Sequence, residues 1–221
     1  MFKKVLIAED VDSISLGVKK ALEGYNGINT IHAKYCDEAI LKLKSAEVAG
    51  QPFDLLITDL SFKQDHVKVV LADGEDLIDA VKKLYPNLPI IVYSIEDKPF
   101  RIKNLFDLFK INGFVLKGRY SSLELRESIV KIQKGEKYIS KDIAHYLMSK
   151  ETEDITDYDI NILECLAKGF SQNEISEFFF KKNILPTSVS AIEKRINKLK
   201  IQLKAKNTIQ LIALAKDLGM V

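Results

Sequence analysis

Cysteine is scarce in this 221-residue chain and long apolar runs are missing, and each of these features argues against particular classes of protein. Cys36 and Cys165 are its two cysteines and lie far apart, so a disulfide framework or a cysteine metal site is not expected. No apolar run approaches the roughly 18–20 residues that a membrane-spanning helix needs. The first ten residues hold too short an apolar stretch for a signal peptide and end on acids, which predicts a cytoplasmic protein.

The sequence also lacks the local motifs of common enzyme classes. We find no phosphate-cradling glycine loop, no histidine cluster with metal-ligand spacing and no nucleophile elbow. A net charge of +2, with 47% hydrophobic and 29% charged residues, is typical of an ordinary globular chain. A metabolic enzyme is therefore the least favoured interpretation.

Five short apolar runs alternate with helical patterns up to about residue 134. The runs expected to form strands are residues 5–8, 29–33, 55–59, 89–93 and 113–116. Near-continuous apolar strands that alternate with amphipathic helices are typical of a parallel sheet covered by helices on both faces. We therefore expect an α/β fold over residues 1–134, a flavodoxin-like (βα)5 domain.

Carboxylates follow two of these predicted strands. Glu9 and Asp10 come directly after the first strand, and the third strand ends on Asp59. In a flavodoxin-like strand order these ends meet at one edge of the sheet. Two like charges about 4 Å apart repel by roughly 4 kcal/mol at an effective dielectric constant near 20, so the cluster needs a proton or a cation. Oxygen ligands in an open site suit Mg²⁺.

The fourth and fifth predicted strands end on Ser94 and Lys117. Because a carboxylate can form an acyl phosphate, Asp59 is a candidate acceptor of a phosphoryl group. Ser94 could donate a hydrogen bond to the phosphoryl oxygens, and Lys117 could pair with them as a point charge. Each residue alone also fits a structural role, such as a turn cap or a solvated lysine. Four strands that end, in this order, on an acid pair, an aspartate, a serine and a lysine favour the phosphoryl site over these separate structural roles.

On these residues, positions 1 to about 134 resemble the receiver domain of two-component response regulators. The resemblance implies that Asp59 is the phosphoacceptor. It also implies that Mg²⁺ is bound by Asp10, Asp59 and the backbone carbonyl of Ser61, with Glu9 acting through water.

The resemblance assigns Ser94 and Lys117 to contacts with the phosphoryl group and Phe114 to the aromatic switch position of the family. The loop between Asp59 and Gly74 is longer than is usual in receivers, which could alter access to the acceptor. His66 lies in this loop, where a solvated histidine is the simpler interpretation than an acid–base group.

Residues 135–154 are polar and charged, and we expect them to form a linker that is partly helical. From residue 155 to 221 the pattern is helical only, which predicts a small all-α domain of four helices. Three helix starts carry capping-box patterns, formed by Thr156 with Asp159, Ser171 with Glu174 and Ser190 with Glu193.

The segment AKGFSQNEI, residues 167–175, resembles the A-x-G-x-S-N-x-E-I core of the LuxR-type helix-turn-helix in regulators of the NarL/FixJ class. The resemblance places the recognition helix at residues 191–203. The turn before this helix is longer than usual, and the T-V-K-x-H segment of the family is not reproduced. The base-contacting positions of the family therefore cannot be assigned directly to residues of this chain.

The predicted recognition helix is rich in basic residues. From Glu193 to Lys206 there are six basic residues against one acid. The apolar positions share one face, so the basic residues are expected on the other side, either as a solvated surface or as a DNA-binding surface. In the helix-turn-helix context we expect contacts to DNA phosphates from Lys194, Lys198 and Lys200. Arg195 and Asn197 are better suited to base edges.

Both resemblances together imply a phosphorylation-switched, DNA-binding transcription regulator and not an enzyme. The expected partners are a sensor histidine kinase, double-stranded DNA and a second copy of the chain that is contacted through the last helix, with no membrane. Two alternatives stay open. One is a pseudo-receiver that works without phosphorylation, and the other is a receiver joined to an RNA-binding antiterminator module.

Overall fold

The computed structural model describes residues 2–23, 27–63, 68–147 and 155–221. The chain divides into two compact units, one formed by residues 1–97 and 104–144 and the other by residues 98–103 and 145–221. The expectations for His66 and for the end of the linker at 148–154 concern residues outside this description.

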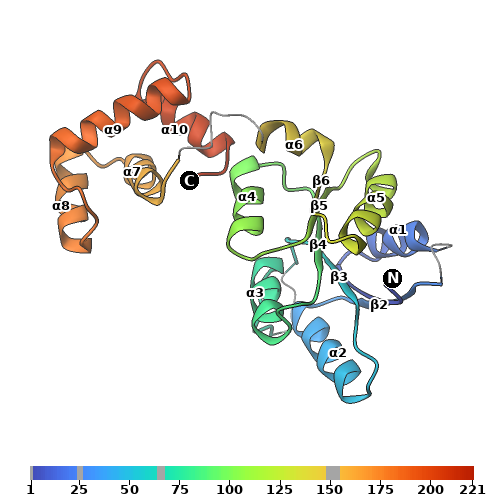
Figure 1. The fold of residues 1–221 in the computed structure, drawn as a ribbon. Coiled ribbons are helices and arrows are strands. Elements are labelled where there is room, and N and C mark those ends of the chain that lie inside the picture. The colour runs from blue at the N-terminus through green and yellow to red at the C-terminus, as the bar shows by residue number, and fades with distance from the viewer. Residues whose placement is uncertain (1, 24–26, 64–67, 148–154) are drawn as a thin grey trace. The chain divides into compact units, whose positions relative to one another are not determined.

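The first unit is built on a parallel sheet that contains six strands in the described part of the chain (Figure 1). The strands are β1 (Lys4–Ala8), β2 (Asn29–Ala33), β3 (Leu55–Thr58), β4 (Ile90–Ser94), β5 (Gly113–Leu116) and β6 (Tyr138–Ile139). Their order is β2-β1-β3-β4-β5-β6, and every pair of neighbours is parallel. The first five strands confirm the predicted flavodoxin-like order.

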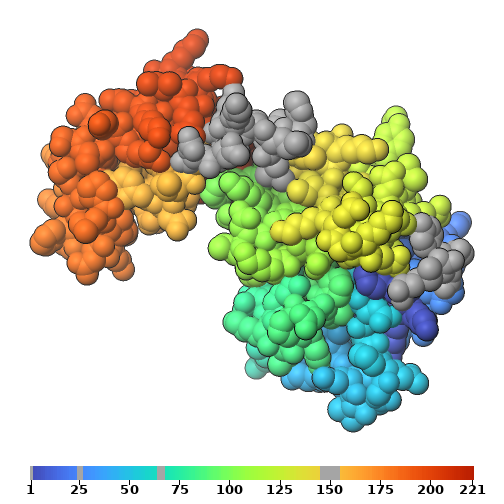
Figure 2. Space-filling view, viewed as in Figure 1, coloured from blue at the N-terminus to red at the C-terminus, as the bar shows by residue number. Residues whose placement is uncertain are grey.

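Helices cover both faces of this sheet because its central strands are apolar on both sides. α1 (Asp12–Leu22) and α5 (Ser121–Gln133) pack against each other on one face, while α2 (Cys36–Val48) and α3 (Gly74–Leu84) pack on the other (Figure 1). α4 (Pro99–Asp107) connects β4 to β5. Figure 2 gives the same view with the side chains filled in and coloured by residue number.

β6 is the element that the sequence analysis missed. Tyr138 and Ile139 pair with Gly113 and Phe114 of β5, although both residues were assigned to the linker. A strand of two residues is too short to show an apolar alternation, so its sequence gives no strand signal. The chain continues into α6 (Lys141–Leu147).

The second unit contains the four predicted helices. They are α7 (Asp157–Ala167), α8 (Gln172–Lys182), α9 (Val189–Gln202) and α10 (Thr208–Asp217). Each contributes apolar side chains to one core, among them Leu163, Phe179, Ile196 and Leu211, all at most 2% exposed. The four-helix prediction is therefore confirmed.

Two of the three predicted capping boxes are present, at Thr156 and at Ser171. The third prediction, a box at Ser190, is wrong. α9 begins two residues earlier, because the hydroxyl of Ser188 accepts a hydrogen bond from the amide of Ala191 at 3.4 Å and caps the helix there. None of the helices in the described residues combines the length and apolar character needed to cross a membrane.

Candidate functional site

Three acids meet at the carboxyl-terminal edge of the sheet. Carboxylate oxygens of Glu9, Asp10 and Asp59 lie within 4.8 Å of one another. The register explains this geometry, since Ala8 of β1 pairs with Thr58 of β3 and the acids follow directly. Glu9 is 2% exposed and Asp59 is 6% exposed. The predicted meeting of the three carboxylates is confirmed.

Lys117 reaches into this cluster from the end of β5. Its Nζ atom donates to Oε2 of Glu9 at 2.7 Å and to Oδ2 of Asp59 at 2.6 Å. Its side chain is only 9% exposed. The ammonium group therefore offsets the repulsion between two buried carboxylates, and solvent screens these contacts little.

Burial and charge shift the proton affinities of two of these groups. Burial raises the pKa of Glu9, and the hydrogen bond and charge of Lys117 offset only part of that shift. Burial alone would lower the pKa of Lys117, but the hydrogen bonds and charges of Asp59 and Glu9 outweigh it and raise the pKa above its usual value. Lys117 consequently stays protonated at neutral pH.

Backbone amides fix the orientation of the acids. The amide of Leu60 donates to Oδ1 of Asp59 at 2.6 Å, so both oxygens of Asp59 have partners, the second one being Lys117. The amide of Lys63 donates to Asp10 at 3.0 Å. The first residues of the loop that follows β3 thus donate hydrogen bonds to two of the three carboxylates.

The far end of the same loop returns to Asp59 through Gly74. The amide of Gly74 donates to the carbonyl of Leu60 at 2.9 Å. A Cβ atom at position 74 would lie 2.0 Å from the carbonyl oxygen of Asp59, so only glycine fits this approach without displacing the backbone. Both ends of the long loop are therefore fastened beside Asp59.

The donor set suits a hard cation. Carboxylate oxygens in a partly open cluster are the ligands that Mg²⁺ prefers, and the residues present fit this ion. The carbonyl of Ser61, the water-mediated role of Glu9 and the direct ligation by Asp10 and Asp59 stay predictions.

Ser94 and Phe114 lie near the same edge of the sheet. Ser94 ends β4 and is 1% exposed, and its carbonyl accepts from the amide of Lys117 at 2.8 Å. Phe114 is fully buried in β5. The contact of Ser94 with a phosphoryl group and the switch role of Phe114 stay predictions.

The basic side of α9 faces solvent in the second unit. Lys194, Asn197 and Lys198 are exposed, and Lys200 is partly exposed. The buried residues of α9 are Ile192, Ile196 and Leu199, as the apolar spacing predicted.

Arg195 has a structural partner that the sequence analysis missed. Its Nε and Nη2 atoms both donate to the carboxylate of Asp159 on α7. The side chain of Asp159 is fully buried, and that of Arg195 is 21% exposed. Burial would raise the pKa of Asp159, but the hydrogen bonds from Arg195 and Thr156 hold it below its usual value. The guanidinium group, which we expected at a base edge, is thus directed at α7.

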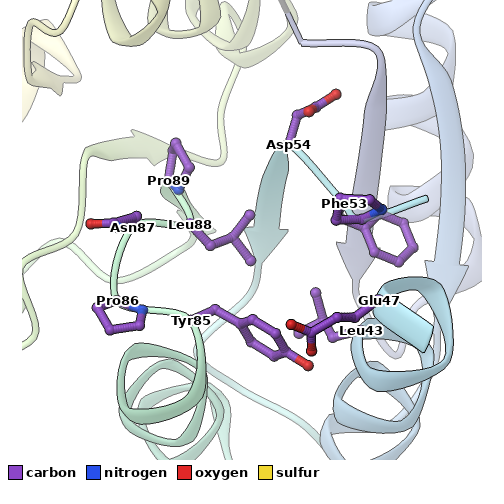
Figure 3. Close-up of a pocket in the computed structure, with 10 residues that line it drawn as sticks. Leu43, Glu47, Phe53, Asp54, Tyr85, Pro86, Asn87, Leu88 and Pro89 are labelled. Atoms are coloured by element: carbon purple, nitrogen blue, oxygen red, sulfur yellow. The ribbon is translucent and has the colours of Figure 1, made fainter. Parts of the chain in front are cut away.

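A hollow of about 410 Å³ lies at the amino-terminal ends of β3 and β4 (Figure 3). Apolar and proline side chains form most of its wall, including Leu43, Phe53, Tyr85 and Leu88. Of its two carboxylates, that of Asp54 accepts hydrogen bonds from the backbone amides of residues 3 and 4 at 2.7 and 2.9 Å and so holds the start of β1, and that of Glu47 is hydrogen-bonded to Tyr85. The acid cluster with Lys117 is therefore the better candidate for chemistry.

A parallel sheet with three acids and a lysine at its carboxyl edge, followed by a four-helix unit with an exposed basic helix, is the arrangement expected of response regulators that join a receiver domain to a LuxR-type helix-turn-helix. Comparison with known proteins agrees. Transcriptional regulatory protein RcsB of Escherichia coli strain K12 is 27% identical over 213 residues, which cover 94% of this chain and 91% of RcsB. Response regulator UvrY of Escherichia coli O6:H1 strain CFT073 is 23% identical over 205 residues, covering 87% and 85%.

Solved structures give the same result. RcsB of Salmonella typhimurium matches with a TM-score of 0.71 and 26% identity, covering 97% of this chain and 99% of that chain. An RcsB–DNA complex matches with a TM-score of 0.67 and 26% identity, covering 98% and 99%. No protein-family model matches the chain. The protein is a homologue of the RcsB and UvrY response regulators over nearly its full length, and these relatives are regulators and not enzymes.

Proposed function

We propose that the protein is a cytoplasmic transcription regulator whose binding to double-stranded DNA is controlled by phosphorylation of Asp59. The observation that carries this proposal is the position of Lys117, which contacts Glu9 and Asp59 within a cluster that includes Asp10. A sensor histidine kinase, or a small phosphodonor, supplies the phosphoryl group.

The transfer itself asks little covalent chemistry of the protein. An oxygen of Asp59 attacks the phosphorus of a phosphohistidine, the P–O bond forms, the P–N bond breaks, and the imidazole leaves. Asp10, Asp59 and the Ser61 carbonyl would hold Mg²⁺ directly and Glu9 would hold it through water, and the ion would supply positive charge that neutralises the transferring group. Lys117, which donates a hydrogen bond to Asp59, adds a positive charge of its own.

Phosphorylation would then change the balance of charge at this edge. It adds about 1.5 to 2 negative charges at neutral pH. Moving a two-state equilibrium from 1:99 to 99:1 takes about 5.5 kcal/mol, whereas one hydrogen bond to a charged group contributes roughly 1.5–3 kcal/mol. Ser94, Lys117 and the buried ring of Phe114 must therefore respond together.

The DNA-binding part of the proposal is supported by relatives and by the surface of α9. RcsB has been solved in complex with DNA, and one such structure contains two RcsB dimers on two parallel DNAs. We propose that this chain also binds DNA as a homodimer. Exposed Lys194 and Lys198 and partly exposed Lys200 would contact phosphates, and Asn197 is the better candidate for a base edge.

Phosphoryl incorporation from labelled acetyl phosphate tests the first part. Wild-type protein should take up label in the presence of Mg²⁺, and Asp59→Asn should take up none. Asp79→Asn, at a partly exposed position on α3, is the matched control and should label normally. Labelling of Asp59→Asn at the wild-type level would refute the acceptor assignment. A wild-type protein that never labels would favour the pseudo-receiver.

Salt-dependent binding to selected genomic DNA fragments tests the second part. Lys198→Ala should weaken binding to all sequences alike and lower the salt slope by about 1. Asn197→Ala should instead relax sequence preference, and Lys20→Ala, exposed on α1, should change neither property. Preferential displacement of the protein by single-stranded or structured RNA would point to the antiterminator alternative.

A further inference from the structure

The second unit contains an open hollow of about 600 Å³ beside α9. It lies between the start of α7, the turn that precedes α9, and one side of α9 itself. Its lining residues are Thr156, Tyr158, Leu185, Pro186, Ala191, Lys194, Arg195 and Lys198. The volume is within the range of about 300–1,000 Å³ that is typical of small-molecule sites.

The wall formed by the turn is held in place by hydrogen bonds. The hydroxyl of Tyr158 donates to the carbonyl of Pro186 at 2.7 Å, and the hydroxyl of Ser176 donates to the carbonyl of Thr187 at 2.6 Å. The amide of Ile184 donates to the carbonyl of Phe179 at 2.9 Å. These bonds join the turn to α7 and α8, so the hollow is a built feature of the unit.

The lining combines apolar side chains with basic ones. Leu185 is 77% exposed and, with Tyr158 and Pro186, gives the hollow an apolar wall. No acidic residue lines it. The charge of Arg195 is balanced by Asp159, whereas Lys194 and Lys198 form no ion pair with any residue in the described part of the chain. Two uncompensated ammonium groups therefore border an exposed apolar surface.

We propose that this hollow binds a small amphipathic anion, with an apolar body against Leu185, Tyr158 and Pro186 and one carboxylate, sulfonate or phosphate group at Lys194 and Lys198. An apolar wall with a few charged groups at its border is the usual composition of a ligand site. The same lysines are candidate contacts to DNA phosphates. Under the proposed function, the bound anion and DNA compete for them, so that each lowers the affinity for the other.

Fluorescence titration of the full chain with anilinonaphthalene sulfonate tests the ligand site without DNA. This dye has an aromatic body and one sulfonate. We expect saturable binding at one site per chain. The neutral dye phenylnaphthylamine, which lacks the sulfonate, and inorganic phosphate, which lacks the apolar body, should both bind at least about tenfold more weakly, because each loses one half of the interaction.

Surface variants locate the bound dye. Lys194→Ala with Lys198→Ala, and separately Leu185→Ser, should each weaken dye binding about tenfold. The matched controls are Lys181→Ala with Lys182→Ala, exposed at the end of α8, and Phe180→Ser, whose ring is 74% exposed outside the hollow. These controls should leave dye affinity unchanged. All substituted side chains are exposed, and circular dichroism verifies that each variant is folded.

The outcomes separate this proposal from the proposed function. Equal affinity in the lining variants and the controls, or no saturable binding, overturns the ligand site whatever the protein does with DNA. Loss of dye binding in the lining variants alone supports the site even if DNA binding fails. Addition of duplex DNA to the dye complex should then reverse the fluorescence. Dye and DNA bound together at full affinity would overturn the competition.

Discussion

The hydroxyl of Ser140 accepts a hydrogen bond from the backbone amide of Leu116 at 2.9 Å and donates one to the carboxylate of Glu124. Leu116 ends β5 and directly precedes Lys117, whereas Ser140 directly follows β6. The segment beyond residue 134 is thereby bonded to the strand that positions Lys117 at the acid cluster.

Ser140→Ala should lower the free energy of unfolding by about 1–3 kcal/mol, because it leaves the Leu116 amide and the Glu124 carboxylate without this partner. Ser140 is 1% exposed, so water does not readily replace the hydroxyl. Urea denaturation measures the change. Ser122→Ala, exposed on α5, is the control and should stay within about 0.5 kcal/mol of wild type. Equal stability of both variants would contradict a structural role for Ser140.

Gly74→Ala should destabilise the first unit and displace Asp59. The added methyl group would meet the Asp59 carbonyl at 2.0 Å and the Cα atom of Leu60 at 2.7 Å, so the backbone must move. We expect a loss of about 2 kcal/mol or more in thermal unfolding, together with slower phosphoryl incorporation.

Gly17→Ala is the matched control for this change. Gly17 is exposed within α1, and nothing lies within 4 Å of the added Cβ atom. Alanine favours a helix over glycine by about 1 kcal/mol, so this variant should gain stability. A Gly74→Ala protein as stable and as reactive as wild type would show that the close approach is not required.

Lys117→Ala should make thermal stability more dependent on Mg²⁺. Without the ammonium group, the buried carboxylates of Glu9 and Asp59 repel each other, and a divalent cation is the remaining source of positive charge. A ligand at 100 times its Kd stabilises the native state by about 2.7 kcal/mol. We expect the melting temperature of Lys117→Ala to rise more on Mg²⁺ addition than that of wild type.

Two controls accompany the Mg²⁺ titration. Asp10→Asn should reduce the response to Mg²⁺, and Lys83→Ala, at an exposed position on α3, should respond like wild type. If Mg²⁺ raises the melting temperatures of Lys117→Ala and wild type equally, the cation does not replace the charge of Lys117 at these carboxylates.

The Asp159–Arg195 pair predicts acid sensitivity of the second unit. Because the pKa of Asp159 is lower in the folded protein, its contribution to stability is fully present above the unfolded value of about 3.9 and is lost as the pH falls through the folded value. Asp159→Asn should therefore flatten the loss of stability below about pH 4. At neutral pH it should cost about 2–4 kcal/mol, since Arg195 loses its charged partner.

Asp157→Asn is the control for this pair. Asp157 lies in the same first turn of α7 but is exposed. Its variant should keep the acid transition of the wild type. Unfolding is followed by circular dichroism at a series of pH values for both variants and the wild type. Identical acid transitions in all three proteins would show that the Asp159–Arg195 pair is not the source of the acid sensitivity.

Much of the first unit could be predicted because its signals are local. The runs at 5–8 and 55–57 are apolar throughout, as strands buried on both faces must be, and the acids follow the ends of both strands. Parallel pairing then forces residues that end neighbouring strands to one edge. The meeting of Glu9, Asp10 and Asp59 follows from these two facts alone.

The features that escaped prediction depend on contacts distant in sequence or on competing local signals. Asp159 and Arg195 are 36 positions apart, and each alone fits a capping residue and a surface cation. Ser188 and Ser190 both precede the apolar stripe of α9, and the presence of Glu193 favoured the wrong one. The helix instead starts directly after the turn that Tyr158 and Ser176 hold in place.

The short strand β6 has a practical consequence for isolating the receiver half. Were the polypeptide cut after residue 134, the carbonyls of Asn112 and Phe114 would lose the amides of Tyr138 and Ser140 as hydrogen-bond donors, and the exposed edge of β5 could then pair with a strand of another molecule. A fragment that continues to Ala144 would include β6, which pairs with this edge. It would also keep the hydrogen bond from the Leu116 amide to Ser140, next to Lys117.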